Sequence, residues 1–194
     1  HEKGWPSLTR IQNASIKAFF TNENNLILSA ATAQGKTEAA FLPAISKIKS
    51  WEKGIKIIYI SPLIALINDQ FKRISDMCFD MDIPITSWHG EASKSKKDKL
   101  IANPRGIVLI TPESIEALLS DKSEIASKLF SEVNYIIVDE IHSFLIGNRG
   151  LQLRSLLERI LRYTYNPPRM IGLSATIGEE NYNLSKKFLS LIHI

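Results

Sequence analysis

Short runs of apolar and β-branched residues recur along the chain, separated by longer stretches in which apolar residues return every three or four positions. Several of these runs, such as Ile57 to Ile60 and Ile136 to Val138, show no alternation with polar residues. Strands that are covered on both faces have this composition, so the runs predict a parallel sheet between helices. We expect strands at Leu26 to Ala30, Ile55 to Ser61, Ile85 to Trp88, Ile107 to Thr111, Tyr135 to Asp139 and Met170 to Ser174.

The stretches between these runs have the periodicity of amphipathic helices. The clearest of them, Leu151 to Tyr163, places its leucines and Ile160 on one face and its charged residues elsewhere. Repeated alternation of strand and helix predicts an α/β fold with a doubly wound, mainly parallel sheet. The other helices that we expect lie at Lys36 to Ile48, Leu63 to Phe71 and Ser114 to Leu119.

Composition excludes some classes of protein but does not indicate a function. A chain of 194 residues with 44% apolar and 23% charged residues fits one ordinary globular domain. The single cysteine, Cys78, excludes an internal disulfide framework and a cysteine-rich zinc site, and we expect it to be buried. There is no long apolar run and no leader, so a cytoplasmic location is the default expectation. A net charge of +4 permits a polyanionic partner without demonstrating one.

The sequence AATAQGKT, residues 30–37, lies between a predicted strand and a predicted helix, where a phosphate-binding loop must lie. In such a loop, backbone N–H groups and the helix N-terminus face the phosphates. Lys36 would reach the β- and γ-phosphates, and the Thr37 hydroxyl would bind Mg²⁺. The alternative is a chance Gly-Lys-Thr at the start of an ordinary helix. The cofactor-binding residues expected here are Thr32, Ala33, Gln34, Gly35, Lys36 and Thr37.

Two acidic residues, Asp139 and Glu140, follow a buried strand. Carboxylates at such a strand end are costly unless they serve a ligand, and ligands of open α/β sheets bind beyond the carboxyl ends of the strands. Asp139 would hold Mg²⁺ through its water shell, and Glu140 would deprotonate the attacking water as a catalytic residue alongside Lys36. The alternative is that Asp139 caps a helix and Glu140 lies on the surface.

Three segments in order resemble motifs I, II and III of the superfamily 2 helicases: residues 30–37, Asp-Glu-Ile-His at 139–142 and Ser-Ala-Thr at 174–176. The Arg149-Gly150 pair is similar to the large helicase-related (Lhr) and Ski-like branches. The resemblance covers nearly the whole chain and implies a P-loop NTPase of the RecA-like type. We therefore expect residues 1–194 to form the first RecA-like domain, with the second motor domain outside this chain.

The resemblance also implies roles for single residues. Gln12 would hydrogen-bond adenine, and His142, Ser174 and Thr176 would couple nucleotide state to the rest of the motor. Without the other motifs, His142 would be a helix-end residue and Ser174 a strand end. The nucleic-acid contacts implied by motifs Ia and Ib and the short glycine motif fall on Pro62, Gly90, Thr111 and Pro112.

The implied activity is ATP- and Mg²⁺-dependent movement on DNA or RNA, with contacts to the backbone of a single strand and no base readout. The alternative is an ATP-gated nucleic-acid clamp with negligible turnover, and an intact Glu140 favours the enzyme. A small-molecule kinase is disfavoured because no lid is apparent. Two departures from the pattern are Ala30, where a glycine is usual, and the absence of a basic residue at Leu63 and Ile64.

Weaker signals have competing interpretations. The four lysines of residues 91–99 form either a phosphate-contacting patch or, as we prefer, a solvated helix face. Trp88 either stacks on a base or belongs to the core, and Trp5 either packs on adenine or lies on the surface.

Overall fold

A computed structural model of the chain describes residues 7–31, 34–145, 147–175 and 179–190. Strands and helices alternate along it, as the hydrophobic pattern predicts. The elements are α1 (Arg10–Thr21), β1 (Leu26–Ser29), α2 (Lys36–Lys47), β2 (Gly54–Ile60), α3 (Ile64–Met77), η1 (Phe79–Met81), β3 (Ile85–Trp88), α4 (Lys94–Ala102), β4 (Arg105–Ile110), α5 (Pro112–Asp121), α6 (Ser123–Phe130), β5 (Tyr135–Val138), η2 (Ile141–Phe144), α7 (Asn148–Leu161), β6 (Arg169–Ser174) and α8 (Glu179–Ser190).

The described strands form one six-stranded sheet in the order β1-β6-β5-β2-β4-β3, and every pair of neighbours is parallel. The predicted α/β fold and parallel sheet are thus confirmed. The predicted strand ends differ by one or two residues, and β6 begins at the buried Arg169 rather than at Met170. Because all strands run the same way, their carboxyl ends lie along one edge of the sheet.

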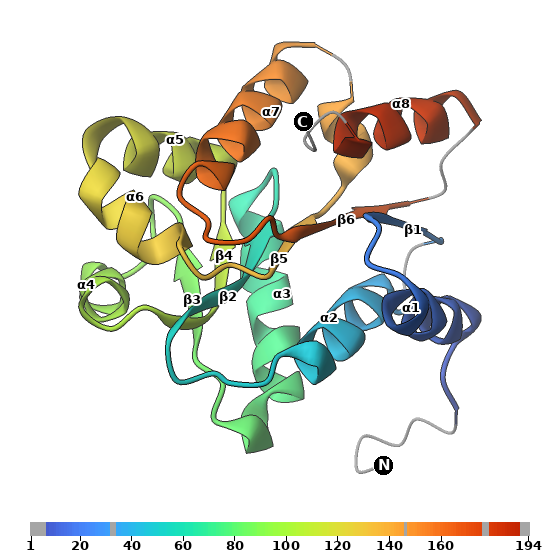
Figure 1. Ribbon diagram of the computed structural model, residues 1–194, viewed down its shortest axis with the longest axis horizontal. Coiled ribbons are helices and arrows are strands. Elements are labelled where there is room, and N and C mark those ends of the chain that lie inside the picture. Colours follow the sequence, from blue (N-terminus) through green and yellow to red (C-terminus); the bar gives the residue numbers. More distant parts are fainter. Residues whose placement is uncertain (1–6, 32–33, 146, 176–178, 191–194) are drawn as a thin grey trace.

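Helices cover both faces of the sheet (Figure 1). Alternate strand residues divide between two cores: Tyr59 and Ile137 pack with α1, α2 and α3, whereas Ile58 and Ile136 pack with α4 to α8. A strand buried on both faces must be apolar at successive positions, which accounts for the unbroken runs in the sequence. Cys78 and Trp88 are buried, as expected of core residues.

The helices α1 and α2 are joined by a hydrogen bond that depends on a proline. Pro43 lies inside α2 and has no N–H to donate to the carbonyl of Ala39. The hydroxyl of Ser15, on α1, donates to that carbonyl instead, at 2.5 Å. The two helices therefore pack side by side (Figure 1) through a hydrogen bond that the proline makes available.

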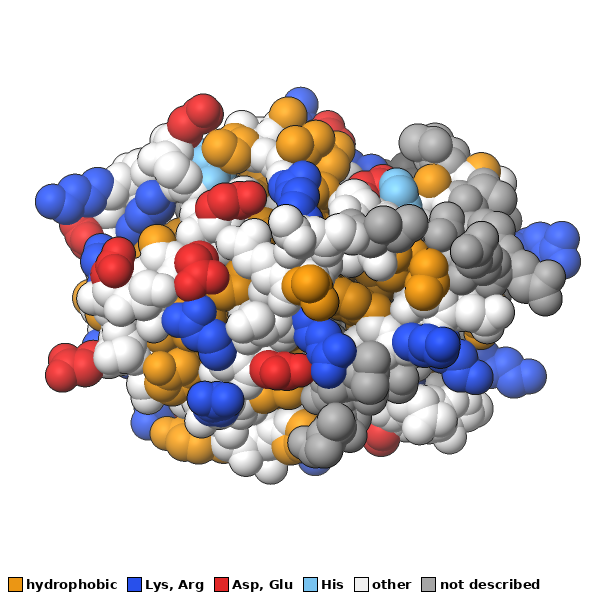
Figure 2. All heavy atoms as spheres, turned by 90° about the horizontal axis from the view of Figure 1, so that it is seen from above, with side chains coloured by type: hydrophobic (Ala, Val, Ile, Leu, Met, Phe, Trp, Pro, Cys, Tyr) orange, Lys and Arg blue, Asp and Glu red, His pale blue; other side chains and the backbone are white. Residues whose placement is uncertain are grey.

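The structure corrects several helix boundaries. α3 runs to Met77, well beyond Phe71, and α5 begins at Pro112, with Thr111 as its N-cap. α6 was not expected at all. The lysine run contributes to α4, which is exposed apart from Leu100 and partly covered positions. On the face shown in Figure 2, basic and acidic side chains are interspersed, so the net positive charge is not gathered there in one patch.

Candidate nucleotide and nucleic-acid site

The order of the strands sorts the predicted site residues into two groups along the carboxyl edge of the sheet. The loop after β1, Asp139 and Glu140 after β5, and Ser174 at the end of β6 occupy one half, because these three strands are neighbours. The segments expected to contact nucleic acid follow β2, β4 and β3, which form the other half. In the sequence the second group lies between the loop after β1 and the residues after β5 and β6, and the order of the strands brings the two separated parts of the first group together.

The predicted phosphate-binding loop requires a glycine immediately before α2. Gly35 has a left-handed backbone with φ of 79°, and a Cβ atom there would lie 2.5 Å from Nε2 of Gln12. The Lys36 ammonium donates to the carbonyls of Ala30 at 2.7 Å and Ala31 at 3.2 Å. Ala30 itself does not have a positive φ, so the missing glycine imposes no strain at that position. Thr32 and Ala33 lie outside the described residues.

Gln12 is buried beside this loop. Its Oε1 accepts the N–H of Thr9 at 2.9 Å, which completes a reciprocal capping box at the start of α1. The Thr9 hydroxyl donates to the carbonyl of Gln34 at 3.2 Å. The start of α1, which carries Gln12, is therefore attached directly to the loop.

Asp139 is almost completely buried, at 7% exposure, and each carboxylate oxygen has a donor. Oδ1 accepts the N–H of Glu140 at 2.9 Å, and Oδ2 accepts the hydroxyl of Tyr59. Burial raises the pKa of this carboxyl above its ordinary value, while the Tyr59 hydrogen bond and the Lys36 ammonium act in the opposite direction. The alternative in which Asp139 caps a helix is wrong, because Glu140 and not Asp139 occupies the N-cap position of η2.

Glu140 occupies a backbone conformation that glutamate rarely adopts, with φ of 47° and ψ of 46°. Its Oε2 lies 3.2 Å from Nδ1 of His142, and the same nitrogen lies 2.9 Å from the hydroxyl of Ser174. His142 thus connects the acidic turn to the end of β6. Thr176, the third expected coupling residue, lies outside the described residues.

In the other half of the edge, Pro62 follows β2, Gly90 follows β3, and Thr111 and Pro112 follow β4. Gly90 is exposed, whereas the Thr111 hydroxyl is buried and accepts the N–H of Ser114 at 3.4 Å as a helix cap. Because its side chain caps α5, any contact from Thr111 to a ligand would have to come chiefly from its backbone.

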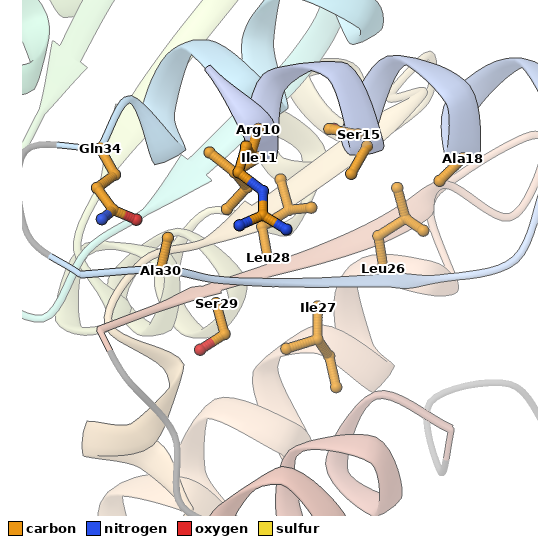
Figure 3. Close-up of a pocket in the computed structure, with 11 residues that line it drawn as sticks. Arg10, Ile11, Ser15, Ala18, Leu26, Ile27, Leu28, Ser29, Ala30 and Gln34 are labelled. Carbon is orange, nitrogen blue, oxygen red and sulfur yellow. The ribbon is translucent and has the colours of Figure 1, made fainter.

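A cleft of about 560 Å³ lies between α1 and β1, beside the loop (Figure 3). Its lining is mostly apolar, and Arg10 reaches from α1 toward β1 across it. In the part of the chain that the structure describes, neither Lys36, Thr37 nor Asp139 lines this cleft. Ala30 and Gln34 of the loop do line the cleft, so it adjoins the loop on the side of α1.

Comparison with known proteins decides the family. Residues 9–184 match the family model for DEAD/DEAH box helicases. The chain belongs to the DEAD/DEAH box helicase family. The resemblance to the helicases drawn from the motifs is thereby confirmed, including its similarity to the Lhr and Ski-like branches.

Two relatives and one solved structure place this helicase domain more closely. The ATP-dependent helicase Lhr-Core of Methanocaldococcus jannaschii is 35% identical, over 91% of this chain and 22% of that protein. The activating signal cointegrator 1 complex subunit 3-like protein of Dictyostelium discoideum is 31% identical, over 97% of this chain and 9% of that protein. The structure of Mycobacterium smegmatis helicase Lhr bound to ssDNA and AMP-PNP has a TM-score of 0.82 and 28% identity, over 97% of this chain and 25% of that one. This chain therefore spans a quarter or less of each of these proteins.

Three contacts near the helicase motifs were not predicted from the sequence. Arg149 donates to the carbonyl of Pro62 at 3.3 Å, and Glu38 accepts from Arg73 at 2.6 Å while remaining buried. Tyr59 donates to Asp139. For Tyr59 a signal existed: a tyrosine within a buried strand needs a hydrogen-bond partner for its hydroxyl.

Among the helices of the described residues, none combines the length and apolar composition that crossing a bilayer requires.

Proposed function

We propose that this chain is the ATP-binding half of an ATP-dependent DNA or RNA helicase or translocase. The observation that carries the proposal is the separation along the sheet edge, where the phosphate-binding loop and the acidic turn lie in the same half. It is supported by the name of the Methanocaldococcus jannaschii relative and by the Lhr structure with ssDNA and AMP-PNP. We infer the same class of ligands for this chain, and a cytoplasmic place of action.

The residues present suit a magnesium nucleotide. No group of three or more His, Cys, Asp or Glu side chains that could hold a metal occurs in the described residues. Mg²⁺ does not need such a cage, since it is usually held by one or two protein oxygens together with water and substrate phosphates. The Thr37 hydroxyl and the Asp139 carboxylate supply hard oxygen ligands of this kind. Mg²⁺ held there would offset the negative charge of the phosphates.

The chain's own residues divide the remaining work. Backbone N–H groups of the loop, including those of Thr32, Ala33, Gln34 and Gly35, would bind the phosphates, and the Lys36 ammonium would leave its carbonyl partners to bind them also. The Glu140 carboxylate, oriented by His142, would accept a proton from the attacking water. Gln12 would recognise adenine, and His142, Ser174 and Thr176 would report the nucleotide state.

Nucleic acid would bind along the other half of the edge, at Pro62, Gly90, Thr111 and Pro112. Contacts from backbone amides to phosphates position a strand without reading its bases, so we expect little sequence preference. A second RecA-like domain of the full-length protein would supply the arginine that stabilises the transferred phosphoryl group, a contribution on the order of 10³-fold or more. The isolated chain should therefore turn over ATP very slowly.

The test is nucleic-acid-stimulated ATP hydrolysis by the full-length protein. Glu140→Gln should lower turnover by about 10²- to 10⁴-fold, the usual contribution of a general base, and should leave nucleotide binding in place. Lys36→Ala should weaken nucleotide binding as well as turnover. Lys47→Ala is the matched control, because Lys47 lies at the opposite end of α2. Undiminished turnover in both site variants contradicts the proposal, and tight nucleic-acid binding without turnover in the unsubstituted protein would favour a clamp.

A further inference from the structure

Tyr59 is the polar residue in an otherwise aliphatic end of β2. Its side chain is fully buried, and its ring packs against Phe41 of α2 with ring centroids 5.8 Å apart. A phenol hydroxyl in such a place must find a hydrogen-bond partner or lose the free energy of its hydration. The partner is Oδ2 of Asp139. Phenylalanine would pack equally well there, so packing alone does not account for the hydroxyl.

The register of the sheet accounts for the contact. Tyr59 pairs with Ile137 of the neighbouring β5, and Asp139 lies two residues further along, where its backbone N–H still donates to the carbonyl of Ile60 at 2.8 Å. Residues two apart in a strand face the same side, so Asp139 shares the face of Ile137 and Tyr59. That face is covered by α2, whose first turn carries Lys36 and Thr37.

The two hydrogen bonds fix the carboxylate. The N–H of Glu140 binds Oδ1 and the Tyr59 hydroxyl binds Oδ2, so neither oxygen can rotate without breaking a hydrogen bond. An ionised carboxylate has about four lone-pair sites, so about two remain for further ligands. The Tyr59 hydroxyl therefore selects which lone pairs Asp139 presents outward.

We propose that Tyr59 is a positioning residue of the magnesium site, whose hydroxyl holds the Asp139 carboxylate in the orientation that receives the ion and its water shell. This inference rests on the proposed function, since it assigns Asp139 to Mg²⁺. Removing a group that orients a metal ligand typically lowers metal affinity or activity by about 10- to 100-fold.

The sequence offers a matched control. Tyr135 is also a buried tyrosine on the same face, and its ring packs against Phe19 with centroids 5.8 Å apart. It begins β5, however, at the end of the strand away from Asp139. Tyr59→Phe and Tyr135→Phe each remove one hydroxyl and keep the ring, so they differ in their distance from the metal site rather than in chemistry.

The experiment measures binding of a fluorescent ATP analogue to the full-length protein, first in excess EDTA and then as a function of Mg²⁺ concentration. We expect Tyr59→Phe to bind the metal-free analogue within about twofold of the unsubstituted protein and to need about 10- to 100-fold more Mg²⁺. Tyr135→Phe should match the unsubstituted protein in both titrations. A thermal melting curve establishes that each variant is folded. Tyr59→Leu is a second variant without the hydroxyl, and leucine matches the aliphatic residues around it in β2.

The outcomes separate this inference from the proposed function. A Mg²⁺ titration of Tyr59→Phe that coincides with that of the unsubstituted protein overturns the positioning role alone. Equal weakening by Tyr59→Phe and Tyr135→Phe also overturns it, because the effect would then come from the core. If the unsubstituted protein binds the analogue without any response to Mg²⁺, or Lys36→Ala binds it equally well, the proposed function fails as well.

Discussion

Glu140 combines the expected catalytic carboxylate with an unfavourable backbone. At φ of 47° and ψ of 46° it lies in the left-handed region, which costs a residue with a Cβ roughly 1–2 kcal/mol. Strain of this kind often accompanies function, because the turn must aim the side chain rather than relax. We therefore expect the fold to become more stable when the Cβ is removed, at the expense of activity.

The magnitude follows from comparing Glu140→Gly with Glu140→Ala. Both variants lose the carboxylate and its 3.2 Å contact with His142, but only glycine relieves the backbone. Glycine also makes the unfolded chain more flexible, which costs about 0.5–1 kcal/mol relative to alanine. The net advantage of Glu140→Gly over Glu140→Ala should therefore lie within about 0–1.5 kcal/mol and centre on ~0.75 kcal/mol, or roughly 1.5–3 °C in melting temperature for a domain of this size.

The assay is urea denaturation of the 194-residue chain, with both variants measured beside the unsubstituted protein. If the slope of the free energy of unfolding against urea concentration is the same in both variants, they differ only in stability. Both variants of the full-length protein should lose ATP turnover, so that Glu140→Gly is more stable than Glu140→Ala and equally inactive. Lower stability of the glycine variant than of the alanine variant would refute the strain at this turn.

Two further predictions concern how α1 is held beside the loop. Ser15→Ala should lower the free energy of unfolding by about 1–3 kcal/mol, because the buried carbonyl of Ala39 loses its donor. Adding Pro43→Ala should recover part of this loss, because residue 43 then has a backbone N–H to donate to that carbonyl. No recovery in the double variant would contradict this prediction. Arg169→Met should lower the free energy of unfolding by about 2–4 kcal/mol, since the buried guanidinium donates to backbone carbonyls at the end of α1 and in the turn after it. The control Arg162→Met, at an exposed position, should change that free energy by no more than about 0.5 kcal/mol. Urea denaturation checks both, and a loss below about 1 kcal/mol for Arg169→Met would show that this arginine is dispensable.

Much of the fold could be predicted because its strands are buried on both faces. Unbroken β-branched runs such as Ile136 to Val138 are typical of strands between two layers of helices, and the parallel arrangement followed from them. α6, by contrast, spans only eight residues and is separated from α5 by Lys122 alone. A segment that short has too few turns to establish a helical period, and its stability comes from packing in the core beneath it.

The candidate site was partly predictable for a similar reason. The loop, Asp139 and Glu140 follow strands, and the carboxyl ends of parallel strands must share one edge. The order of the strands, which separates the nucleotide half from the nucleic-acid half, depends on long-range pairing that local patterns do not contain. The hydrogen bond from Tyr59 and the left-handed turn at Glu140 likewise depend on contacts between strands distant in sequence.

The most direct test of the central claim is a crystal structure of the protein with a non-hydrolysable ATP analogue and Mn²⁺, which replaces Mg²⁺ and can be located by its anomalous scattering. We predict one Mn²⁺ peak beside the Thr37 hydroxyl and the Asp139 carboxylate, with the Lys36 ammonium on the phosphates and Glu140 facing the γ-phosphate. A nucleotide bound elsewhere, for example in the cleft between α1 and β1, with Asp139 remote from the metal, would contradict that claim.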